Sequence, residues 1–191
     1  MAEVVLFHHA QGLTEGVGAF ADRLRDAGHT VHTPDLYDAH TFPTLEEGIG
    51  YAQKVGFGTL RERGAQAAND LPAEVVYAGI SLGGMAAQML AQTRAGARGA
   101  VLMESCVPSS EFGSRWPDGV PVQVHGMDAD PFFAREGDID AARVLVKEVE
   151  DGELFVYSGD RHLFTDSSLA SYDAEATQLV IERVLDLLKR V

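Results

Sequence analysis

One serine of the chain lies in a motif that can make it a nucleophile. Gly79-Ile80-Ser81-Leu82-Gly83 follows an apolar, β-forming run and precedes a stretch with helical character. In a Gly-x-Ser-x-Gly turn between a strand and a helix, the sharp bend holds the serine hydroxyl clear of the backbone. The N–H of Leu82 and the positive end of the helix dipole then face a developing oxyanion. The motif predicts acyl transfer through Ser81; a turn that only packs the helix on its strand is the alternative.

A serine nucleophile needs a general base, and His162 is placed to provide it. His162 lies in the segment Ser158 to Phe164, just after the last β-like run of the chain. Behind a turn of this type, an acid and then a histidine follow the serine in chain order. The acid should therefore follow the preceding β-like run, where Asp128 and Asp130 compete. We expect Asp130, because Pro131 stiffens the backbone beside it, and we keep Asp128 as the alternative.

These side chains need a scaffold that brings distant loops together, and the rest of the chain predicts one. Short apolar runs alternate with longer amphipathic stretches, which is typical of a parallel sheet with helices on both faces. The expected strands are Val4–Phe7, Thr30–Thr33, Glu74–Ala78, Ala100–Met103, Val120–Val124 and Leu154–Tyr157. The expected helices are Val17–Ala27, Leu45–Lys54, Thr59–Asn69, Gly83–Gln92, Ile139–Glu148 and Tyr172–Arg190. We therefore expect an α/β fold with a mostly parallel six-stranded sheet.

Length and composition fit one domain over residues 1–191. Chains of about 100 to 200 residues usually close around a single core, and 46% of this chain is apolar. No repeat, low-complexity tract or linker divides it. Only the segment from Glu104 to Gly119 separates the fourth and fifth expected strands, which is too short for a helical cap domain. We therefore expect an open site.

The charge and the cysteine content exclude several classes of partner and location. The chain has 15 Lys and Arg against 29 Asp and Glu, a net charge of −14, which disfavours nucleic acid and anionic membranes. No apolar run approaches the ~20 residues of a bilayer span, and Met1 to Phe7 lacks the pattern of a secretory signal. The single Cys106 excludes internal disulfides and fits a reducing compartment. We expect a cytoplasmic protein without a cofactor, and the oligomeric state stays open.

Taken together, several segments resemble the dienelactone hydrolases of the α/β-hydrolase superfamily. The similar segments are the loop at Gly12, Pro34-Asp35-Leu36-Tyr37, Gly79 to Gly84, His125 to Phe133 and Ser158 to Phe164. The resemblance implies an α/β-hydrolase fold, hydrolase activity and a triad of Ser81, Asp130 and His162. It also implies that the N–H of Ala10, in the loop after the first strand, is the oxyanion donor beside Leu82, with Gln11 as its alternative.

Two departures from this family bear on the substrate. Its best-known members carry cysteine where this chain has Ser81, and a glutamate in the first loop, where this chain has His8-His9. We therefore expect serine esterase chemistry on small carboxylic esters or lactones, and we do not carry over the dienelactone substrate. Acidic residues near the site would favour neutral substrates over anionic ones. Candidates for the substrate pocket are His9, Trp116, Phe132, Arg161 and Phe164.

Three other interpretations are weaker. Gly16 to Ala21 matches a loose dinucleotide fingerprint, with Asp35 about 20 residues on, but eight residues separate Gly16 from the first strand and displace the phosphate cradle. Neighbouring side chains of extended backbone point to opposite faces, so His8 and His9 do not share an ion, and we expect no metal. A non-catalytic ligand-binding protein on a hydrolase scaffold stays an alternative, because fold alone does not imply activity.

Overall fold

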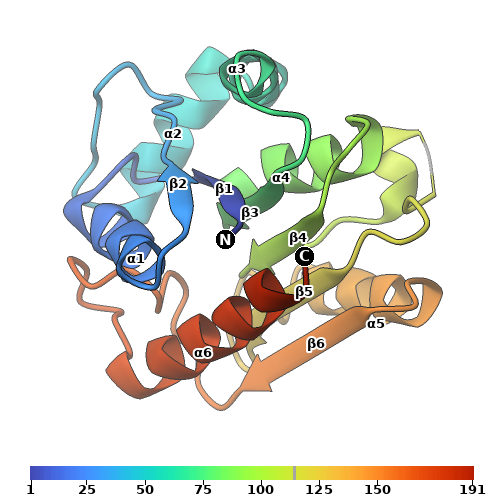
Figure 1. Ribbon diagram of the computed structural model, residues 1–191. Coiled ribbons are helices and arrows are strands. Elements are labelled where there is room, and N and C mark those ends of the chain that lie inside the picture. The colour runs from blue at the N-terminus through green and yellow to red at the C-terminus, as the bar shows by residue number, and fades with distance from the viewer. Residues whose placement is uncertain (114) are drawn as a thin grey trace.

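A six-stranded sheet runs through the middle of the protein, and its strands all point the same way (Figure 1). The structure is a computed structural model and describes residues 1–113 and 115–191. The strands are β1 (Glu3–Phe7), β2 (Thr30–His32), β3 (Val76–Ile80), β4 (Gly99–Met103), β5 (Val122–Met127) and β6 (Gly152–Tyr157). Their order is β2-β1-β3-β4-β5-β6, and every neighbouring pair is parallel. The predicted parallel sheet is confirmed, and all carboxyl ends meet at one edge.

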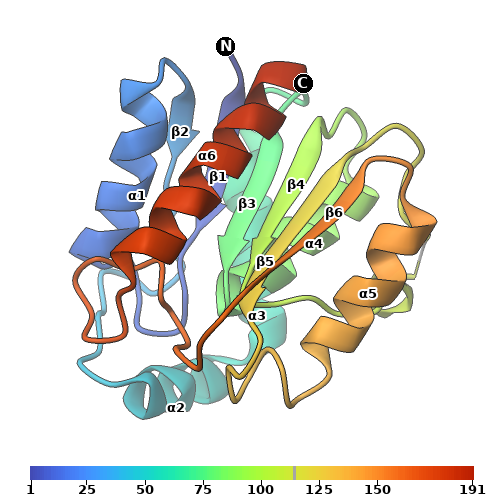
Figure 2. The ribbon, with the colours of Figure 1, turned by 90° about the horizontal axis from the view of Figure 1, so that it is seen from below.

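Helices cover both faces of this sheet (Figures 1 and 2). One face carries α1 (Glu15–Asp26) and α6 (Ala174–Arg190); the other carries α4 (Leu82–Thr93) and α5 (Asp138–Glu148), with α2 (Leu45–Val55) and α3 (Phe57–Asn69). Each face buries its own apolar cluster, so Val4 and Leu6 of β1 enter one cluster while Val5 and Phe7 enter the other. Burial on both faces explains why the strands are apolar throughout instead of alternating.

The element boundaries differ from the prediction mainly at β5. This strand continues to Met127, so His125 lies inside the sheet and not in the loop. The sequence did not predict this, because a polar histidine is typical of a loop and not of a buried strand. Here the ring is buried because its Nδ1 has a hydrogen-bond partner, the Tyr157 hydroxyl at 2.9 Å. Burial lowers the pKa of His125 to about 3, so its imidazole is neutral.

No cap domain covers the site among the described residues. Between β4 and β5, residues 104–113 and 115–121 hold one short 3₁₀ helix, Ser109–Phe112. No described helix is long and apolar enough to cross a membrane.

The sheet order locates a crevice at the carboxyl edge. From β1 the chain moves outward to β2 and then crosses to β3 on the opposite side of β1. Ligands of open parallel sheets bind where the order reverses in this way, outside the carboxyl ends of the strands. The loops after β1 and β3 therefore flank the expected site, and α2 lies beyond the strand ends as its outer wall (Figure 2).

Candidate active site

The turn between β3 and α4 forces Ser81 into a strained conformation. Ser81 has φ 49° and ψ −114°, a region that L-residues rarely adopt. Its glycine neighbours are required by space: a Cβ on Gly79 would lie 2.3 Å from the Gly83 carbonyl oxygen, and a Cβ on Gly83 would lie 2.4 Å from that of Phe7. The tight packing of α4 against β1 and β3 therefore holds the Ser81 hydroxyl at the carboxyl edge of the sheet.

A series of hydrogen bonds joins Ser81 to His162, in the loop after β6, and through it to Asp130, in the loop after β5. The Ser81 Oγ lies 2.8 Å from His162 Nε2, and His162 Nδ1 lies 2.7 Å from Asp130 Oδ2. The other oxygen of Asp130 accepts the backbone N–H groups of Phe132 and Phe133, at 2.8 and 3.3 Å. The carboxylate is fully buried and fixed on both sides. With Nδ1 donating to Asp130, Nε2 of a neutral imidazole is free to accept the Ser81 proton.

The structure separates the two aspartates that competed for the acid position. Asp130 contacts His162, whereas the Asp128 carboxylate accepts the Gly159 N–H at 2.9 Å and so links the loops after β5 and β6. Asp128 is exposed. Its contacts are those of a loop-closing residue.

Charge around His162 favours the protonated imidazole. Burial lowers the pKa of His162, but the hydrogen bond to Asp130 and the nearby charges of Glu104 and Asp138 outweigh burial and raise the pKa above its ordinary value. Glu104, directly after β4, is itself buried, and burial raises its pKa to about 7. Three carboxylates thus surround one histidine.

Two backbone N–H groups belong to residues that line the cavity with Ser81. Leu82 is the first residue of α4, and Ala10 lies in the loop after β1; both line the cavity at the site. In the described part of the chain, neither N–H has a hydrogen-bond partner. A tetrahedral oxyanion on a Ser81 adduct would find donors in these two groups.

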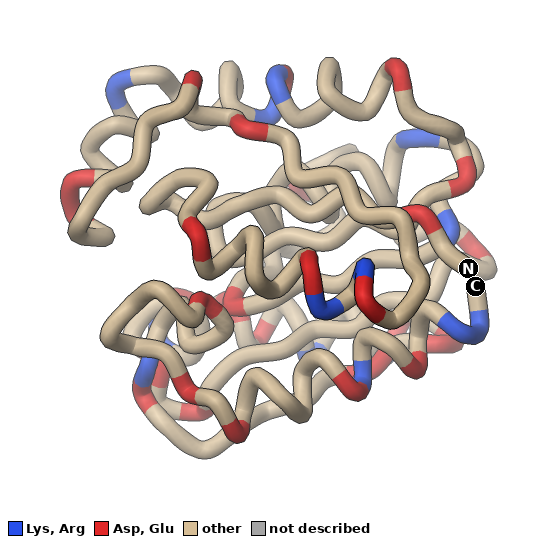
Figure 3. Tube along the Cα trace, turned by 60° about the vertical axis from the view of Figure 1, so that its left-hand side comes forward, with Lys and Arg blue, Asp and Glu red and all other residues tan. Residues whose placement is uncertain are grey.

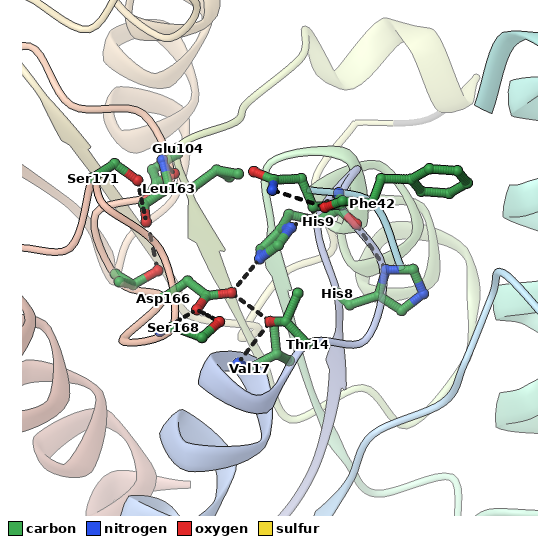
Figure 4. Close-up of polar contacts among 12 residues, drawn as sticks. His8, His9, Thr14, Val17, Phe42, Glu104, Leu163, Asp166, Ser168 and Ser171 are labelled. Atoms are coloured by element: carbon green, nitrogen blue, oxygen red, sulfur yellow. Dashed lines mark hydrogen bonds and ion pairs between the residues drawn. The ribbon is translucent and has the colours of Figure 1, made fainter. Parts of the chain in front are cut away.

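Two buried histidines, His8 and His9, hold the loop that carries Ala10 (Figure 4). His8 Nδ1 donates to the His9 carbonyl oxygen at 2.8 Å, and its Nε2 accepts the Leu36 N–H at 3.0 Å. Burial lowers the pKa of His8 to about 4, in agreement with these neutral roles. His9 Nε2 lies 2.7 Å from Asp166 Oδ2, and its Nδ1 accepts the Gln11 N–H at 3.1 Å. The two rings thus have different partners.

A cavity of about 460 Å³ opens beside Ser81 and His162. Its apolar wall comes from Leu45, Ile49, Phe57, Leu82, Met85, Val107 and Phe132. Its polar wall comes from Ser81, Glu104, Ser105, Glu136, Asp138 and His162, so no described lining residue is Lys or Arg. The Phe132 ring lies 4.6 Å from the His162 ring, centroid to centroid. The cavity is mostly apolar with three carboxylates in its wall, and Figure 3 shows that Asp and Glu positions are spread along the chain and outnumber Lys and Arg.

Of the five predicted pocket residues, the structure brings only Phe132 to this cavity. The Trp116 indole N–H donates to the Val120 carbonyl oxygen at 2.6 Å and is buried near the start of β5, because this loop returns to the amino edge of the sheet. Phe164 is fully buried beside Tyr157.

The other two predicted pocket residues have partners that turn them away. Arg161 donates to the Tyr172 carbonyl oxygen at 2.8 Å and lies 3.7 Å from Asp173, so its guanidinium points toward the start of α6. His9 is fully buried against Asp166. The prediction of a pocket role is wrong for Trp116, Arg161, Phe164 and His9.

Comparisons with known proteins identify the family of the chain. The family model described as "Dienelactone hydrolase family" matches residues 1–191. The chain belongs to the dienelactone hydrolase family. It is therefore a hydrolase of the α/β type, and its family acts on small molecules. A comparison with curated proteins gave no match.

Solved structures share the fold of this family member at low identity. A dienelactone hydrolase-like promiscuous phosphotriesterase from metagenomic libraries has a TM-score of 0.77 and 22% identity, over 100% of this chain and 86% of the other. A dienelactone hydrolase from Klebsiella pneumoniae, assigned as such without proof, has a TM-score of 0.72 and 20% identity, over 100% and 88%. The dienelactone hydrolase from Anabaena variabilis has a TM-score of 0.68 and 19% identity, over 99% of this chain and 86% of the other.

The dinucleotide fingerprint of this dienelactone hydrolase family member has a structural explanation. Thr14 caps α1, and the Asp166 carboxylate lies against its first turn, so that a Cβ on Gly16 would fall 1.6 Å from Asp166 Oδ1. A negative side chain thus occupies the helix end where a pyrophosphate would bind. Asp35 closes a local turn by accepting the Tyr37 N–H at 2.8 Å.

Sequence reasoning missed Glu104 and the His9–Asp166 pair. Glu104 directly follows the last residue of β4, so the rule that located Asp130 and His162 at strand ends could have found it. Glu104, Asp130 and His162 hold potential metal-ligating atoms within 4.8 Å of one another, but each is engaged in hydrogen bonds. No local sequence pattern predicts the His9–Asp166 pair, since 157 residues separate its members.

Proposed function

We propose that residues 1–191 form one domain that acts as a serine hydrolase of small, neutral carboxylic esters or lactones. The observation that carries the proposal is the continuous series of hydrogen bonds from Ser81 through His162 to Asp130, which opens on an apolar cavity. A structural Gly-x-Ser-x-Gly turn would not need a buried carboxylate aligned behind a histidine. Serine takes the place of the cysteine of the best-known family members.

The proposed mechanism proceeds through an acyl-enzyme. Ser81 Oγ attacks the carbonyl carbon while His162 Nε2 takes its proton, and Asp130 stabilises the resulting imidazolium. The N–H groups of Leu82 and Ala10 stabilise the oxyanion, by roughly 3 to 4 kcal/mol per donor in the best-studied case. His162 then returns the proton to the leaving alcohol oxygen. Water, deprotonated by His162, hydrolyses the acyl-enzyme and releases the acid and Ser81.

The lining of the cavity supports a neutral substrate. A carboxylate-bearing substrate would meet Glu104, Glu136 and Asp138 without a described Lys or Arg on the wall. Arg61 lines only a small neighbouring hollow, which shares Phe57 and Met85 with the cavity. The volume of about 460 Å³ suits a small molecule. The promiscuous phosphotriesterase among the similar structures adds neutral phosphotriesters as a second class to assay.

The test of the nucleophile combines a covalent probe with turnover. We expect a fluorophosphonate to add the mass of one probe molecule per chain and to abolish hydrolysis of p-nitrophenyl acetate. Ser81→Ala should show neither labelling nor hydrolysis. Ser110→Ala, in the 3₁₀ helix before β5, is the matched control. Turnover that survives Ser81→Ala contradicts the mechanism, and saturable ligand binding without turnover favours the non-catalytic alternative.

The test of substrate charge uses a matched pair of esters. The methyl p-nitrophenyl diester of succinic acid should be hydrolysed with a kcat/KM about tenfold or more above that of the anionic mono-p-nitrophenyl ester, with a ratio that falls as salt is added. A faster anionic ester contradicts the charge argument. If Arg61→Gln then removes that preference, Arg61 binds the carboxylate.

The remaining expectations accompany this proposal. Catalysis by these residues needs no cofactor or metal. Cys106 is buried, and burial raises the pKa of its thiol to about 12, which fits an unreactive packing residue in a cytoplasmic protein.

A further inference from the structure

A second buried carboxylate lies at the candidate triad, and the mechanism above does not use it. Glu104 follows β4 directly, is 2% exposed and has φ 59°, a conformation that costs energy for a residue other than glycine. Ser81 and Leu163 are also at positive φ, so three strained residues come from three loops at this site. Strain of this kind persists where the surrounding structure requires a particular side-chain position.

The position of the Glu104 carboxylate is fixed by the loop that follows His162. Its Oε2 accepts the Leu163 N–H at 2.5 Å, and Figure 4 shows Glu104 next to Leu163. Its Oε1 lies 3.4 Å from the Thr165 hydroxyl. The same Oε2 lies 3.8 Å from His162 Nδ1, the atom that donates to Asp130 Oδ2 at 2.7 Å. Two carboxylates, from the loops after β4 and β5, therefore lie near one imidazole N–H.

We propose that Glu104 is a second orienting acid for His162: when the Asp130 carboxylate is absent, Glu104 accepts the hydrogen bond from the His162 Nδ1–H. Glu104 acts through His162 and is therefore a positioning residue. The inference rests on the proposed function for its catalytic consequence, but the contact itself does not depend on any substrate.

The geometry requires only a small movement. A hydrogen bond to Nδ1 needs Glu104 Oε2 to approach by about 1 Å, and a carboxylate oxygen can accept this bond while it keeps the Leu163 N–H. In the intact protein Asp130 is closer and holds the donor. Removal of the Asp130 side chain frees both the donor and the space between them.

Loss of the Asp130 carboxylate also favours the ionised form of Glu104. Its pKa is raised to about 7: burial is the main cause and the negative charge of Asp130 adds to it, while the charge of His162 and the hydrogen bonds from Leu163 and Thr165 oppose it. Loss of Asp130 removes a repulsive charge, so Glu104 becomes ionised at lower pH. Among the described residues, Asp138 is the third carboxylate whose charge raises the pKa of the imidazole, and it does so in every variant below that retains it.

Two substitutions of Asp130 should then differ in an unusual order. In Asp130→Asn, the amide oxygen must face the N–H groups of Phe132 and Phe133, so the amide NH₂ faces His162 Nδ1. It donates to that nitrogen and fixes the wrong tautomer, an effect of about 10⁴-fold in the best-studied triad. Asp130→Ala has no such donor and leaves Nδ1–H to Glu104. The less conservative substitution should retain the higher activity.

The experiment compares these variants with and without Glu104. We expect Asp130→Ala to exceed Asp130→Asn in kcat/KM for a neutral p-nitrophenyl ester by about tenfold or more. Glu104→Gln, which keeps an oxygen for the Leu163 N–H, should cost under about tenfold alone but about 100-fold in the Asp130→Ala background. Asp138→Asn, which removes another carboxylate from the cavity, should cost the same factor in both backgrounds.

A second readout does not require turnover. ¹⁵N-histidine NMR, with His162 assigned from its loss in His162→Gln, gives the imidazole pKa of each variant. Glu104→Gln should lower that pKa by about one unit or more in Asp130→Ala and by less in the intact protein. Equal effects of Glu104→Gln in both backgrounds, in rate or in pKa, overturn the inference. Absent ester turnover in the intact protein contradicts only the proposed function, because the NMR comparison still decides the role of Glu104.

Discussion

The protein contains two buried histidine–aspartate pairs with the same hydrogen-bond length and different surroundings. His162 Nδ1 donates to Asp130 Oδ2 at 2.7 Å, and His9 Nε2 donates to Asp166 Oδ2 at 2.7 Å. Both carboxylates are fully buried, and each accepts further bonds from its own loop. A search for a histidine held by a buried aspartate would find both.

The pairs differ in the partner of the other imidazole nitrogen. His162 Nε2 faces the Ser81 hydroxyl at the cavity, whereas His9 Nδ1 accepts the backbone N–H of Gln11. One ring can therefore take a proton from a nucleophile, and the other can only hold a loop. The aspartate gives a histidine its orientation, but the group opposite the aspartate decides what the histidine does.

The largest expected effect comes from the pair at the cavity. His162→Gln removes the proposed general base, and we expect kcat/KM for a neutral ester to fall by about 10⁴-fold or more, as in well-studied serine hydrolases. Fluorophosphonate labelling of Ser81 should slow in parallel. His9→Gln is the matched substitution, and an equal loss there would contradict the division between the two histidines.

Substitutions of His9 separate its two bonds. Glutamine places an N–H near the Nε2 position and keeps Asp166 paired, but leaves the Gln11 N–H without its acceptor. We expect His9→Gln to lower kcat about tenfold with little change in KM, because the adjacent Ala10 N–H acts on the transition state. Asparagine keeps an acceptor near the Nδ1 position but is too short to reach Asp166. The buried Asp166 carboxylate then lacks this hydrogen bond, so His9→Asn should lower the free energy of unfolding by about 1 to 3 kcal/mol. Steady-state kinetics and urea unfolding distinguish these results.

The Asp166 carboxylate should contribute stability that depends on pH. Burial alone raises its pKa, but hydrogen bonds from His9, Ser168 and Thr14 outweigh burial and lower the pKa to about 2. A carboxyl group with a lowered folded-state pKa stabilises the fold above its unfolded pKa, and that stability is lost as pH falls toward 2. Asp166→Asn should therefore cost roughly 2 kcal/mol at pH 7 and progressively less below pH 4. Urea unfolding at several pH values gives the difference, and a cost independent of pH would contradict the ionic role.

Much of the cavity pair could be predicted from sequence because each residue follows a strand. Ser81, Asp130 and His162 come after three apolar runs, and parallel strands deliver their carboxyl ends to one edge. The fold class followed from the same pattern. Trp116 was misplaced because a loop that leaves the carboxyl edge must return to the amino edge, and sequence does not tell which of its residues belong to which end.

The second pair and most of the pocket wall depend on tertiary packing. His9 and Asp166 meet only because β1 and the loop after β6 converge at the start of α1. Leu45 and Ile49 of α2 have the spacing of a core-facing helix, yet both line the cavity, because α2 lies beyond the strand ends. An apolar helix face looks the same in sequence whether it covers a core or a substrate.

The smallest expected effect lies at the far end of the second pair, where Thr14 joins Asp166 to α1. Its hydroxyl donates to Asp166 Oδ2 at 2.5 Å and accepts the Val17 N–H at 3.3 Å as the N-cap. Thr14→Val removes both bonds without a large change in shape. We expect a loss of about 1 to 2 kcal/mol in the free energy of unfolding, and kcat within about twofold, because His9 still holds Gln11.

A matched cap separates the two bonds of Thr14. Thr44 caps α2 with the same geometry, since its hydroxyl accepts the Glu47 N–H at 3.3 Å, but it is exposed and makes no hydrogen bond to a carboxylate of the described residues. Thr44→Val therefore measures the cap alone, and the excess cost of Thr14→Val measures the bond to Asp166. That excess should shrink below pH 4, where Asp166 begins to take up protons in the unfolded chain. Equal costs at Thr14 and Thr44 at every pH would mean that the second pair ends at Asp166 and does not extend to α1.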